Sequence, residues 1–260
     1  ALATVPLLEV KGRAPKTGYS RDAFGAAWAD VDRNGCDTRN DILARDLTDV
    51  TYKDGTKDCV VLTGTFADPY SGTTIAFERG EKTSTAVQID HVVALSDAWQ
   101  KGAQGWDEAK RTAFANDPLN LWAADGPLNG QKSDGDTATW LPPNKDFRCE
   151  YVARQVGVKF TYGLWVTDAE QVAMASVLST CPDQPLPEGS AVPEVPVVAP
   201  EPTPEPAPAT PEPTTAPPAP EPAPAPAPAP AVEPAPAPVV EQAPAPAPEP
   251  EPVVVPEPAP

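Results

Sequence analysis

The chain has 260 residues, and its formal net charge is −18 at pH 7. The 11 glutamates of residues 184–260 account for most of that charge and leave −7 for residues 1–183. An acidic surface does not attract nucleic acid from a distance, so a polyanionic ligand would have to be bound through local basic groups or a metal. No apolar run approaches the roughly 18 residues of a transmembrane helix, so we expect no transmembrane segment.

Composition predicts a boundary between a folded domain, residues 1–183, and a tail, residues 184–260. Every Trp, Tyr, Phe and Cys lies in residues 1–183, a length that suits one domain with one core. The tail consists almost entirely of Pro, Ala, Glu, Val and Thr. Because such a segment cannot bury enough apolar surface to offset the entropy of ordering, we predict a disordered tail with semi-rigid polyproline II character.

The first part of the chain predicts two short helices and a β-hairpin. After an irregular arm, Ser20 is a suitable N-cap for a helix over residues 21–29, and residues 41–47 form a second helical pattern. Residues 60–66 and 73–77 are rich in β-forming side chains and are separated by turn residues, which is typical of a hairpin.

The second part predicts two more strands among helices. A strand over residues 87–89 leads into Asp90 and His91, and a second strand covers residues 119–123. Asp125 can cap the helix that follows. Further helices are predicted to start at a Ser96 cap and to cover residues 107–115, 151–158 and 168–178. The pattern indicates an α+β fold with little sheet.

Four cysteines predict a disulfide-stabilised, secreted domain. Cys36, Cys59, Cys149 and Cys181 are too widely spaced for a zinc cluster, and their even count favours two disulfides. Three pairings are possible. We favour Cys36 with Cys59 and Cys149 with Cys181, since each pair closes a loop of moderate length. The small-x-small start of the chain has the form of a signal-peptidase remnant, so we expect a secreted or cell-envelope-associated protein. Four buried free thiols in a cytosolic protein are the alternative.

The only histidine, His91, directly follows Asp90, and Asn120, Asn129 and Lys132 come downstream. An Asp-His pair followed by two asparagines nine positions apart, in the order strand, strand, helix, resembles the HNH endonuclease family. The blocks at residues 34–41, 88–95 and 116–121 resemble most closely a secreted bacterial branch of that family. The core of the resemblance covers about residues 85–135 and its wider extent most of residues 10–182.

This resemblance implies a ββα-metal core, with added helices and the hairpin, that hydrolyses phosphodiester bonds in nucleic acid. The expected substrate is DNA rather than RNA, cut with low sequence specificity. His91 would deprotonate the attacking water, while Asp90 and Asn129 would bind Mg²⁺ or Mn²⁺ through oxygen atoms. The family's last ligand is often a histidine, and asparagine at position 129 makes a preference for a transition metal less favourable.

Three further residues are given roles by the resemblance or by their chemistry. Asn120 would brace the loop that orients His91, and Lys132 could meet a phosphate as a point charge. Arg39 is a hypothetical bidentate clamp for the scissile phosphate. Other candidate basic groups for a polyanion are Arg79, Lys82, Lys101, Lys145 and Arg148.

A loop from Asp30 to Asp41 partly fits the calcium-loop pattern. Asp30, Asp32, Asn34 and Gly35 stand at positions one, three, five and six, although position twelve is Asp41 and not glutamate. A calcium site here is a secondary prediction, and a disulfide-anchored loop is the alternative.

The main alternative to a nuclease is a non-enzymatic envelope-binding or adhesin-type protein. In that interpretation the Pro-rich tail spans the cell wall, and Asp90 and His91 are structural. The tail is equally compatible with a nuclease held near the cell surface through cell-wall association. We expect a monomer in either case.

Overall fold

Two antiparallel sheets organise the part of the chain that the computed structural model describes, residues 1–192. One sheet has the order β1 (Thr48–Tyr52), β2 (Val61–Ala67) and β3 (Thr74–Glu78). The other pairs β4 (Val87–His91) with β5 (Leu121–Asp125). Of the tail predicted for residues 184–260, the part from residue 193 onward lies outside the described residues.

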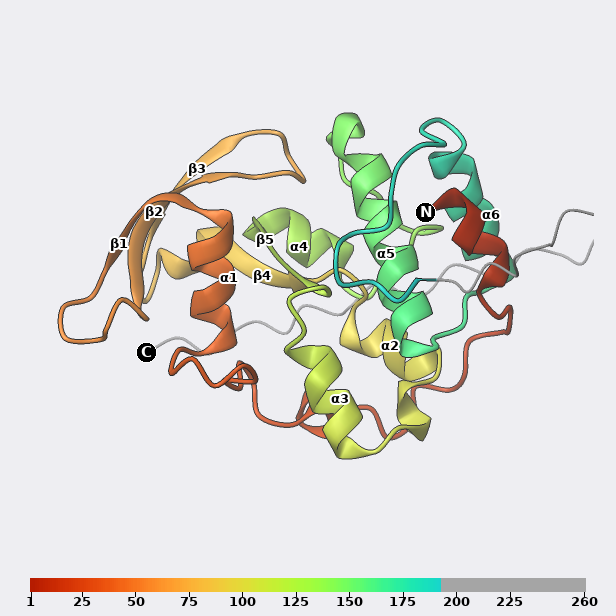
Figure 1. Ribbon diagram of the computed structural model, residues 1–260, viewed down its shortest axis with the longest axis horizontal. Coiled ribbons are helices and arrows are strands. Elements are labelled where there is room, and N and C mark those ends of the chain that lie inside the picture. Colours follow the sequence, from red (N-terminus) through yellow and green to blue (C-terminus); the bar gives the residue numbers. More distant parts are fainter. Residues whose placement is uncertain (193–260) are drawn as a thin grey trace, which may run out of the picture. The chain divides into compact units, whose positions relative to one another are not determined.

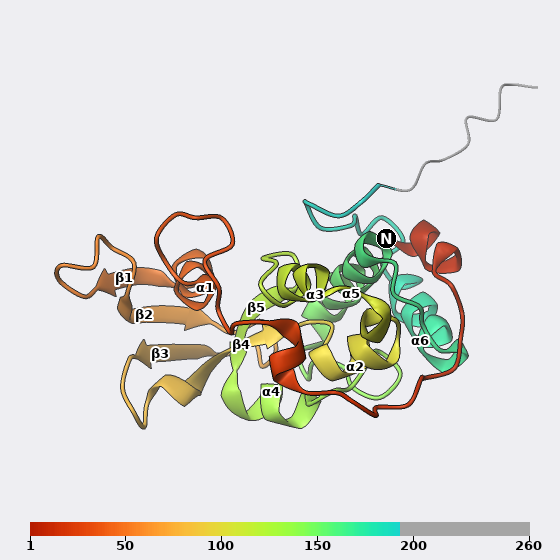
Figure 2. The same cartoon turned by 90° about the horizontal axis from the view of Figure 1, so that it is seen from below.

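Helices surround these sheets and complete a mixed α+β fold, as predicted. Figures 1 and 2 show the three-stranded sheet and α1 at one end of the described part, α2, α3, α5 and α6 at the other, and β4, β5 and α4 between them. The α-helices are α1 (Thr38–Asp46), α2 (Leu95–Gln100), α3 (Glu108–Ala115), α4 (Gly126–Lys132), α5 (Arg148–Tyr162) and α6 (Asp168–Leu178). Short 3₁₀ helices cover Leu2–Leu7, Arg21–Phe24, Ser84–Ala86, Ala103–Gly105 and Lys145–Phe147.

Strands β4 and β5 pair side by side, and helix α4 packs next to them. The register pairs Val87 with Asp125 at one end and His91 with Leu121 at the other. Helix α4 begins directly after β5, where the Asp125 carboxylate accepts a hydrogen bond from the Leu128 amide at 2.8 Å, so the predicted cap is confirmed. A Cβ on Gly126 would overlap the carbonyl oxygen of Thr85. The absence of a side chain therefore lets α4 pack tightly against the start of β4.

Two sequence predictions of local structure are wrong, and one strand was not predicted. Ser20 does cap a helix, but the helix is a single 3₁₀ turn that stops at Gly25, where φ is +78° and a Cβ would overlap Thr112. Ser96 lies inside α2 instead of capping it, and its hydroxyl donates to Asp134 at 3.0 Å. Strand β1 was not predicted because its mostly exposed residues lack an alternating apolar pattern.

Three apolar clusters form the interior of the described part. The first joins α5, α6 and the N-terminal 3₁₀ helix, the second joins α2, α3 and the Arg21–Phe24 turn, and the third joins α1 to both sheets. Because the third cluster includes Ile42, Phe66 and Leu121, it fixes β4 and β5 relative to the three-stranded sheet. No described helix is both long and apolar enough to cross a bilayer.

The favoured disulfide pairing is confirmed. Cys36 bonds to Cys59, which ties the start of α1 to the segment before β2, and Cys149 bonds to Cys181, which ties α5 to the end of α6. These bonds close loops of 23 and 32 residues. In the chain-entropy treatment each bond stabilises the fold by about 3 to 4 kcal/mol.

Packing continues beyond the predicted domain boundary at residue 183. The N-terminal ammonium of Ala1 donates to the Gln184 carbonyl at 2.9 Å, and the Ala191 amide donates to the Thr161 hydroxyl at 2.8 Å. Residues 187–190 lie against Gly157 of α5, where a Cβ would meet Pro187. The segment up to residue 191 therefore belongs to the folded part. Its Pro-rich composition is the reason why it was predicted to be part of the tail.

A buried group of charges holds the helical end together. The ammonium of Lys101 lies 2.6 Å from Glu170, and that of Lys159 lies 2.9 Å from both Asp97 and Glu170. These carboxylates raise the pKa of Lys159 and outweigh the effect of its burial, which alone would lower it. The group links α2, α5, α6, Asp136 and, through Arg13, the N-terminal arm. Lys101 is thus unavailable to a polyanion.

Candidate active site

Four of the predicted site residues line one cavity of about 550 Å³, here called the main cavity. Asp90 and His91 come from the end of β4, Asn129 from α4 and Arg39 from α1. The other lining residues are Lys16, Tyr19, Arg21, Trp28, Gln88, Ile89, Ala94, Leu95, Ser96, Gly130, Ser133 and Asp134. Asn120 and Lys132 are buried and are not among the lining residues of this cavity.

His91 is held in one tautomer by a backbone carbonyl. Its Nε2 lies 2.8 Å from the Ala115 carbonyl oxygen, which can only accept a hydrogen bond, so neutral His91 carries its proton on Nε2. This leaves Nδ1 as the nitrogen with a free lone pair. Burial lowers the pKa of His91 to about 4, and the positive charges of Arg21 and Lys132 act in the same direction. The imidazole is therefore neutral at pH 7.

Asn120 bridges the turn that follows His91. Its Oδ1 accepts from the Val93 amide at 2.8 Å, and its Nδ2 donates to the Val93 carbonyl at 3.2 Å. The Asn120 carbonyl also accepts from the Val92 amide at 2.8 Å. These bonds connect the residues after β4 to the start of β5, so the backbone carrying His91 is restrained from both sides.

The carboxylate of Asp90 is clamped between two buried side chains. Lys132 donates to its Oδ1 at 2.8 Å, and the Tyr70 hydroxyl donates to its Oδ2 at 2.6 Å. Burial raises the pKa of Asp90, while Lys132 and Tyr70 counteract that rise. Lys132 also donates to the His91 carbonyl at 2.8 Å. Its ammonium is directed at β4, whereas a contact with a substrate phosphate was expected.

Asn129 and Asp90 present oxygen atoms of the kind that a hard divalent cation prefers. Asn129 uses its Nδ2 to donate to Gln88 at 2.8 Å, which leaves its Oδ1 available. Each Asp90 oxygen takes one hydrogen bond from the protein and can accept another interaction. This pair fits a cation that keeps several waters, such as Mg²⁺. Within residues 1–192, no group of three or more His, Cys, Asp or Glu side chains forms a richer metal site.

Three basic side chains line the main cavity, together with Asp134, which pairs with Lys16 at 3.2 Å. Arg39 is half-buried and donates to the Val87 carbonyl at 3.3 Å, which places it beside the start of β4. Burial and the neighbouring Arg79 lower the pKa of Arg39. Lys16 and Arg21 come from the N-terminal part and are exposed. Sequence reasoning missed both, because only the fold brings this irregular arm to β4.

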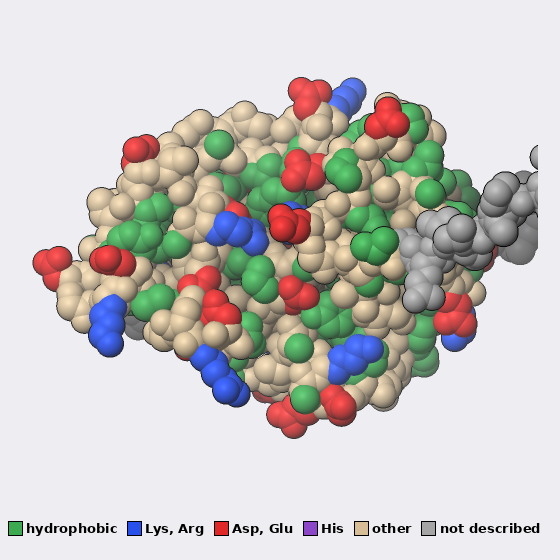
Figure 3. All heavy atoms as spheres, in the orientation of Figure 1, with side chains coloured by type: hydrophobic (Ala, Val, Ile, Leu, Met, Phe, Trp, Pro, Cys, Tyr) green, Lys and Arg blue, Asp and Glu red, His purple; other side chains and the backbone are tan. Residues whose placement is uncertain are grey.

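The rest of the visible surface does not suggest a wide nucleic-acid interface. On the face in Figure 3, acidic and basic side chains are interspersed, without a broad positive field over the described residues of that face. The basic side chains that line the main cavity are local groups of the kind that an acidic protein needs to bind a polyanion.

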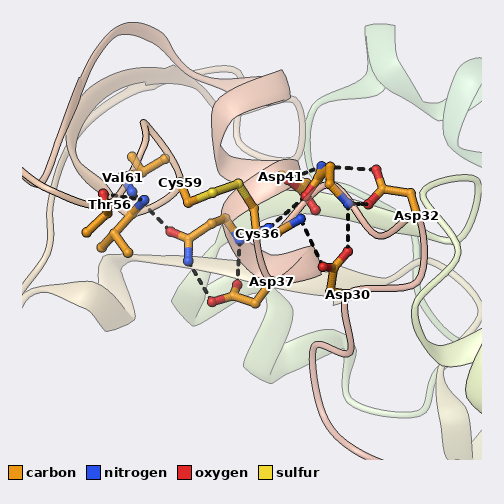
Figure 4. The surroundings of a disulfide bond; sticks show 12 residues. Asp30, Asp32, Cys36, Asp37, Asp41, Thr56, Cys59 and Val61 are labelled. Atoms are coloured by element: carbon orange, nitrogen blue, oxygen red, sulfur yellow. Dashed lines mark hydrogen bonds between the residues drawn. A yellow bond between two sulfur atoms is a disulfide. The ribbon is translucent and has the colours of Figure 1, made fainter.

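The loop from Asp30 to Asp41 forms hydrogen bonds within itself next to the Cys36–Cys59 disulfide, as Figure 4 shows. Asn34 donates to Asp32 at 3.0 Å and to Asp41 at 3.1 Å, and the Gly35 amide donates to Asp30 at 2.9 Å. The carboxylates thus serve the turn itself. Calcium binding at this loop stays a prediction.

Comparison with known proteins gives the family. Residues 37–177 match the family described as GmrSD restriction endonucleases, C-terminal domain. The chain belongs to this family. The relationship to endonucleases predicted from the sequence is thereby confirmed, and it favours the nuclease over the envelope-binding alternative. An "Uncharacterized secreted protein" of Arthroderma benhamiae is 39% identical over 176 residues, which span 67% of this chain and 81% of that protein. No solved structure matches the chain.

The family match and the main cavity overlap only in part. Arg39, Asp90, His91 and Asn129 lie within the matched residues. Lys16, Arg21 and Trp28 also line the cavity, but they come before residue 37. The family match therefore does not cover the part of the site that the N-terminal arm forms.

Proposed function

We propose that this protein is a secreted, metal-dependent endonuclease of the HNH type that hydrolyses phosphodiester bonds, with DNA as its expected substrate and low sequence specificity. The observation that carries the proposal is a neutral histidine, His91, fixed on the Ala115 carbonyl in a cavity that also presents Asp90 and Asn129. The nuclease family supports the reaction class. A base, two oxygen ligands and nearby cations are what this hydrolysis requires.

In this proposal His91 is the general base. Its Nδ1 removes a proton from a water molecule, and the water oxygen forms a new bond to phosphorus as the bond to the leaving oxygen breaks. The Nε2 hydrogen bond to Ala115 stabilises the imidazolium that forms. The leaving oxygen takes up a proton from solvent. A divalent cation held by Asp90 and Asn129 would neutralise charge on the phosphate and the leaving oxygen.

The other site residues position these groups or bind phosphate. Asn120 holds the turn after His91, and Lys132 holds Asp90 through a buried ion pair. Lys132 is thus a positioning residue in this proposal. Arg39 contacts the phosphate backbone, and the exposed Lys16 and Arg21 extend that contact.

Mg²⁺ or Mn²⁺ is the proposed metal, because two oxygen ligands suit a cation that retains several waters and because neither ligand is an imidazole. Secretion is supported by the two disulfides and by the description of the Arthroderma relative. Cell-wall association rests on the tail alone and stays a prediction.

Supercoiled-plasmid cleavage by the full chain tests this function. We expect nicking with Mg²⁺ or Mn²⁺, none in EDTA, and at least about a 100-fold loss in His91→Ala, which is the lower end of the usual range for a lost general base. Tyr52→Ala, which alters a half-buried aromatic residue of β1 outside the main cavity, is the control and keeps the wild-type rate. Cleavage that persists in His91→Ala, or a folded wild type that cuts neither plasmid nor single-stranded DNA or RNA with any divalent metal, would contradict the proposal.

A further inference from the structure

A second cavity lies directly beside His91. It has a volume of about 230 Å³ and is here called the Trp28 cavity, after the residue that borders both cavities together with Arg21, His91 and Leu95. This volume is below the roughly 300 to 1,000 Å³ of clefts that bind whole drug-sized ligands. It suits one planar group next to the proposed base.

One wall of the Trp28 cavity is apolar, and another contains an unsatisfied hydrogen-bond acceptor. Phe24 and Ala115 are buried lining residues. Asn116, only 1% exposed, donates through Nδ2 to the Thr112 carbonyl at 3.0 Å, but its Oδ1 has no partner among the described residues. Buried polar atoms without a partner are uncommon because desolvation is costly, so this oxygen needs a donor, which a water molecule or a ligand in the cavity can supply.

Trp28 has a backbone conformation that is unusual for a bulky residue. Its φ is +58°, in the left-handed region that bulky residues rarely adopt. Its ring stacks on the His91 imidazole, with 6.1 Å between centroids and 20° between planes. Strained residues of this kind cluster at ligand-binding sites. The half-buried indole gives a planar ligand an aromatic surface beside the base.

We propose that the Trp28 cavity binds one unpaired nucleobase of the substrate, so that the enzyme prefers single-stranded to double-stranded nucleic acid. This inference rests on the proposed function and adds the substrate class to it. Amine or imino N–H groups on a base supply the donor that Asn116 Oδ1 lacks, and Trp28 supplies the stacking surface. Arg21, exposed at the border of both cavities, is placed for the adjoining phosphate.

Duplex would be a poor substrate for physical reasons. A base inside a double helix is stacked and paired, and it reaches an enclosed cavity only after extrusion from the helix, which costs free energy. Base stacking on aromatic side chains is sequence-tolerant, since every base has a π-face. The cavity therefore selects for unpaired strands without selecting for sequence.

The test compares end-labelled single strands with the duplex of the same mixed sequence, using the full chain and Mg²⁺ or Mn²⁺. We expect kcat/KM to be at least about 10-fold higher on the single strand, with DNA and RNA strands as separate arms. Trp28→Ala should lower kcat/KM on the single strand by about 10- to 100-fold, more than on duplex. Tyr52→Ala, at a half-buried aromatic residue of β1 outside both cavities, is the control and keeps the preference.

A single strand with one base missing gives a readout that needs no variant. We expect the wild type to leave one gap in the cleavage ladder, at the phosphodiester whose base would occupy the Trp28 cavity. Equal rates on duplex and single strand, with an uninterrupted ladder, would overturn this inference while the endonuclease function stands. Failure to cut any nucleic acid with any divalent metal would overturn the proposed function, and this inference with it.

Discussion

At the scale of single residues, burial decides the pH range over which His91 can act. An exposed imidazole is half protonated near pH 6.5. Burial lowers the pKa of His91 to about 4, so the free base persists well into the acidic range. We predict that kcat/KM at saturating metal stays level from pH 8 to about pH 5 and falls as the pH approaches 4. A pH profile of plasmid nicking checks this, and a fall centred near pH 6.5 would contradict it.

The same lowered pKa has a consequence for stability. Because the folded pKa lies below the unfolded value of 6.5, the unfolded chain binds a proton first as the pH falls. The stability linked to His91 is therefore complete above pH 6.5 and is lost as the pH falls to 4, by about 3 kcal/mol. Urea unfolding at pH 7 and pH 4 should show a smaller loss in His91→Gln than in the wild type. An equal loss in both proteins would be inconsistent with a buried neutral imidazole.

The ion pair between Asp90 and Lys132 gives a second prediction at this scale. Lys132→Met leaves the buried carboxylate without its counter-charge, which typically costs about 3 to 5 kcal/mol. Adding Asp90→Asn removes the stranded charge, so the double variant should regain part of that stability. Denaturant unfolding of both single variants and the double variant measures the coupling. Additive effects would show that the pair does not act as a unit.

At the scale of elements, the position of α4 against β4 sets the proposed metal ligands. A Cβ at Gly126 would overlap the Thr85 carbonyl, so Gly126→Ala must move α4 and with it Asn129. We predict a loss of about 1 to 3 kcal/mol and reduced activity. Gly130→Ala, in the same helix with open space around the position, should instead gain up to about 1 kcal/mol. Thermal unfolding distinguishes them, and equal shifts would mean that the contact at Gly126 is unimportant.

Some helices and strands could be predicted from neighbouring residues alone, and others could not. The Asp125 cap and the strand that leads to His91 were predicted correctly, because each is determined by residues close to it in the sequence. The helix predicted after Ser20 stops early because Gly25 adopts a positive φ against Thr112, a contact that no local pattern announces. Strand β1 is mostly exposed and owes its place to pairing with β2. Local chemistry therefore predicted the elements around the site better than those that depend on tertiary contacts.

At the scale of the whole described molecule, the site combines residues that the sequence keeps far apart. Asp90, His91 and Asn129 were predicted as one group from their spacing and resemblance. The approach of Lys16, Arg21 and the Trp28 ring was not predicted, because it depends on how the N-terminal arm folds back across β4. Lys132 was predicted to meet a substrate phosphate, and its buried ion pair with Asp90 was not predicted, since spacing alone does not reveal a buried partner.

The domain boundary gives a prediction at this same scale. A chain ending at residue 183 loses the contacts of Gln184, Pro187 and Ala191, whereas a chain ending at residue 192 keeps them. We predict a lower Tm, by several degrees, for the shorter chain, because the buried surface of α5 at Gly157 becomes exposed. Calorimetry of both chains checks this. Identical melting would return the boundary to residue 183.

In the proposed mechanism His91 removes the proton from the attacking water, and chemical rescue of a variant without the imidazole tests this role. His91→Gly leaves space for a small base beside the Ala115 carbonyl. The measurement is the nicking rate of this variant against added imidazole and substituted imidazoles of graded pKa. We predict a rate that is very low without base, rises with the concentration of neutral imidazole and depends on its basicity. A variant that cleaves at the wild-type rate, or a folded variant that no added base rescues, would contradict the role of His91.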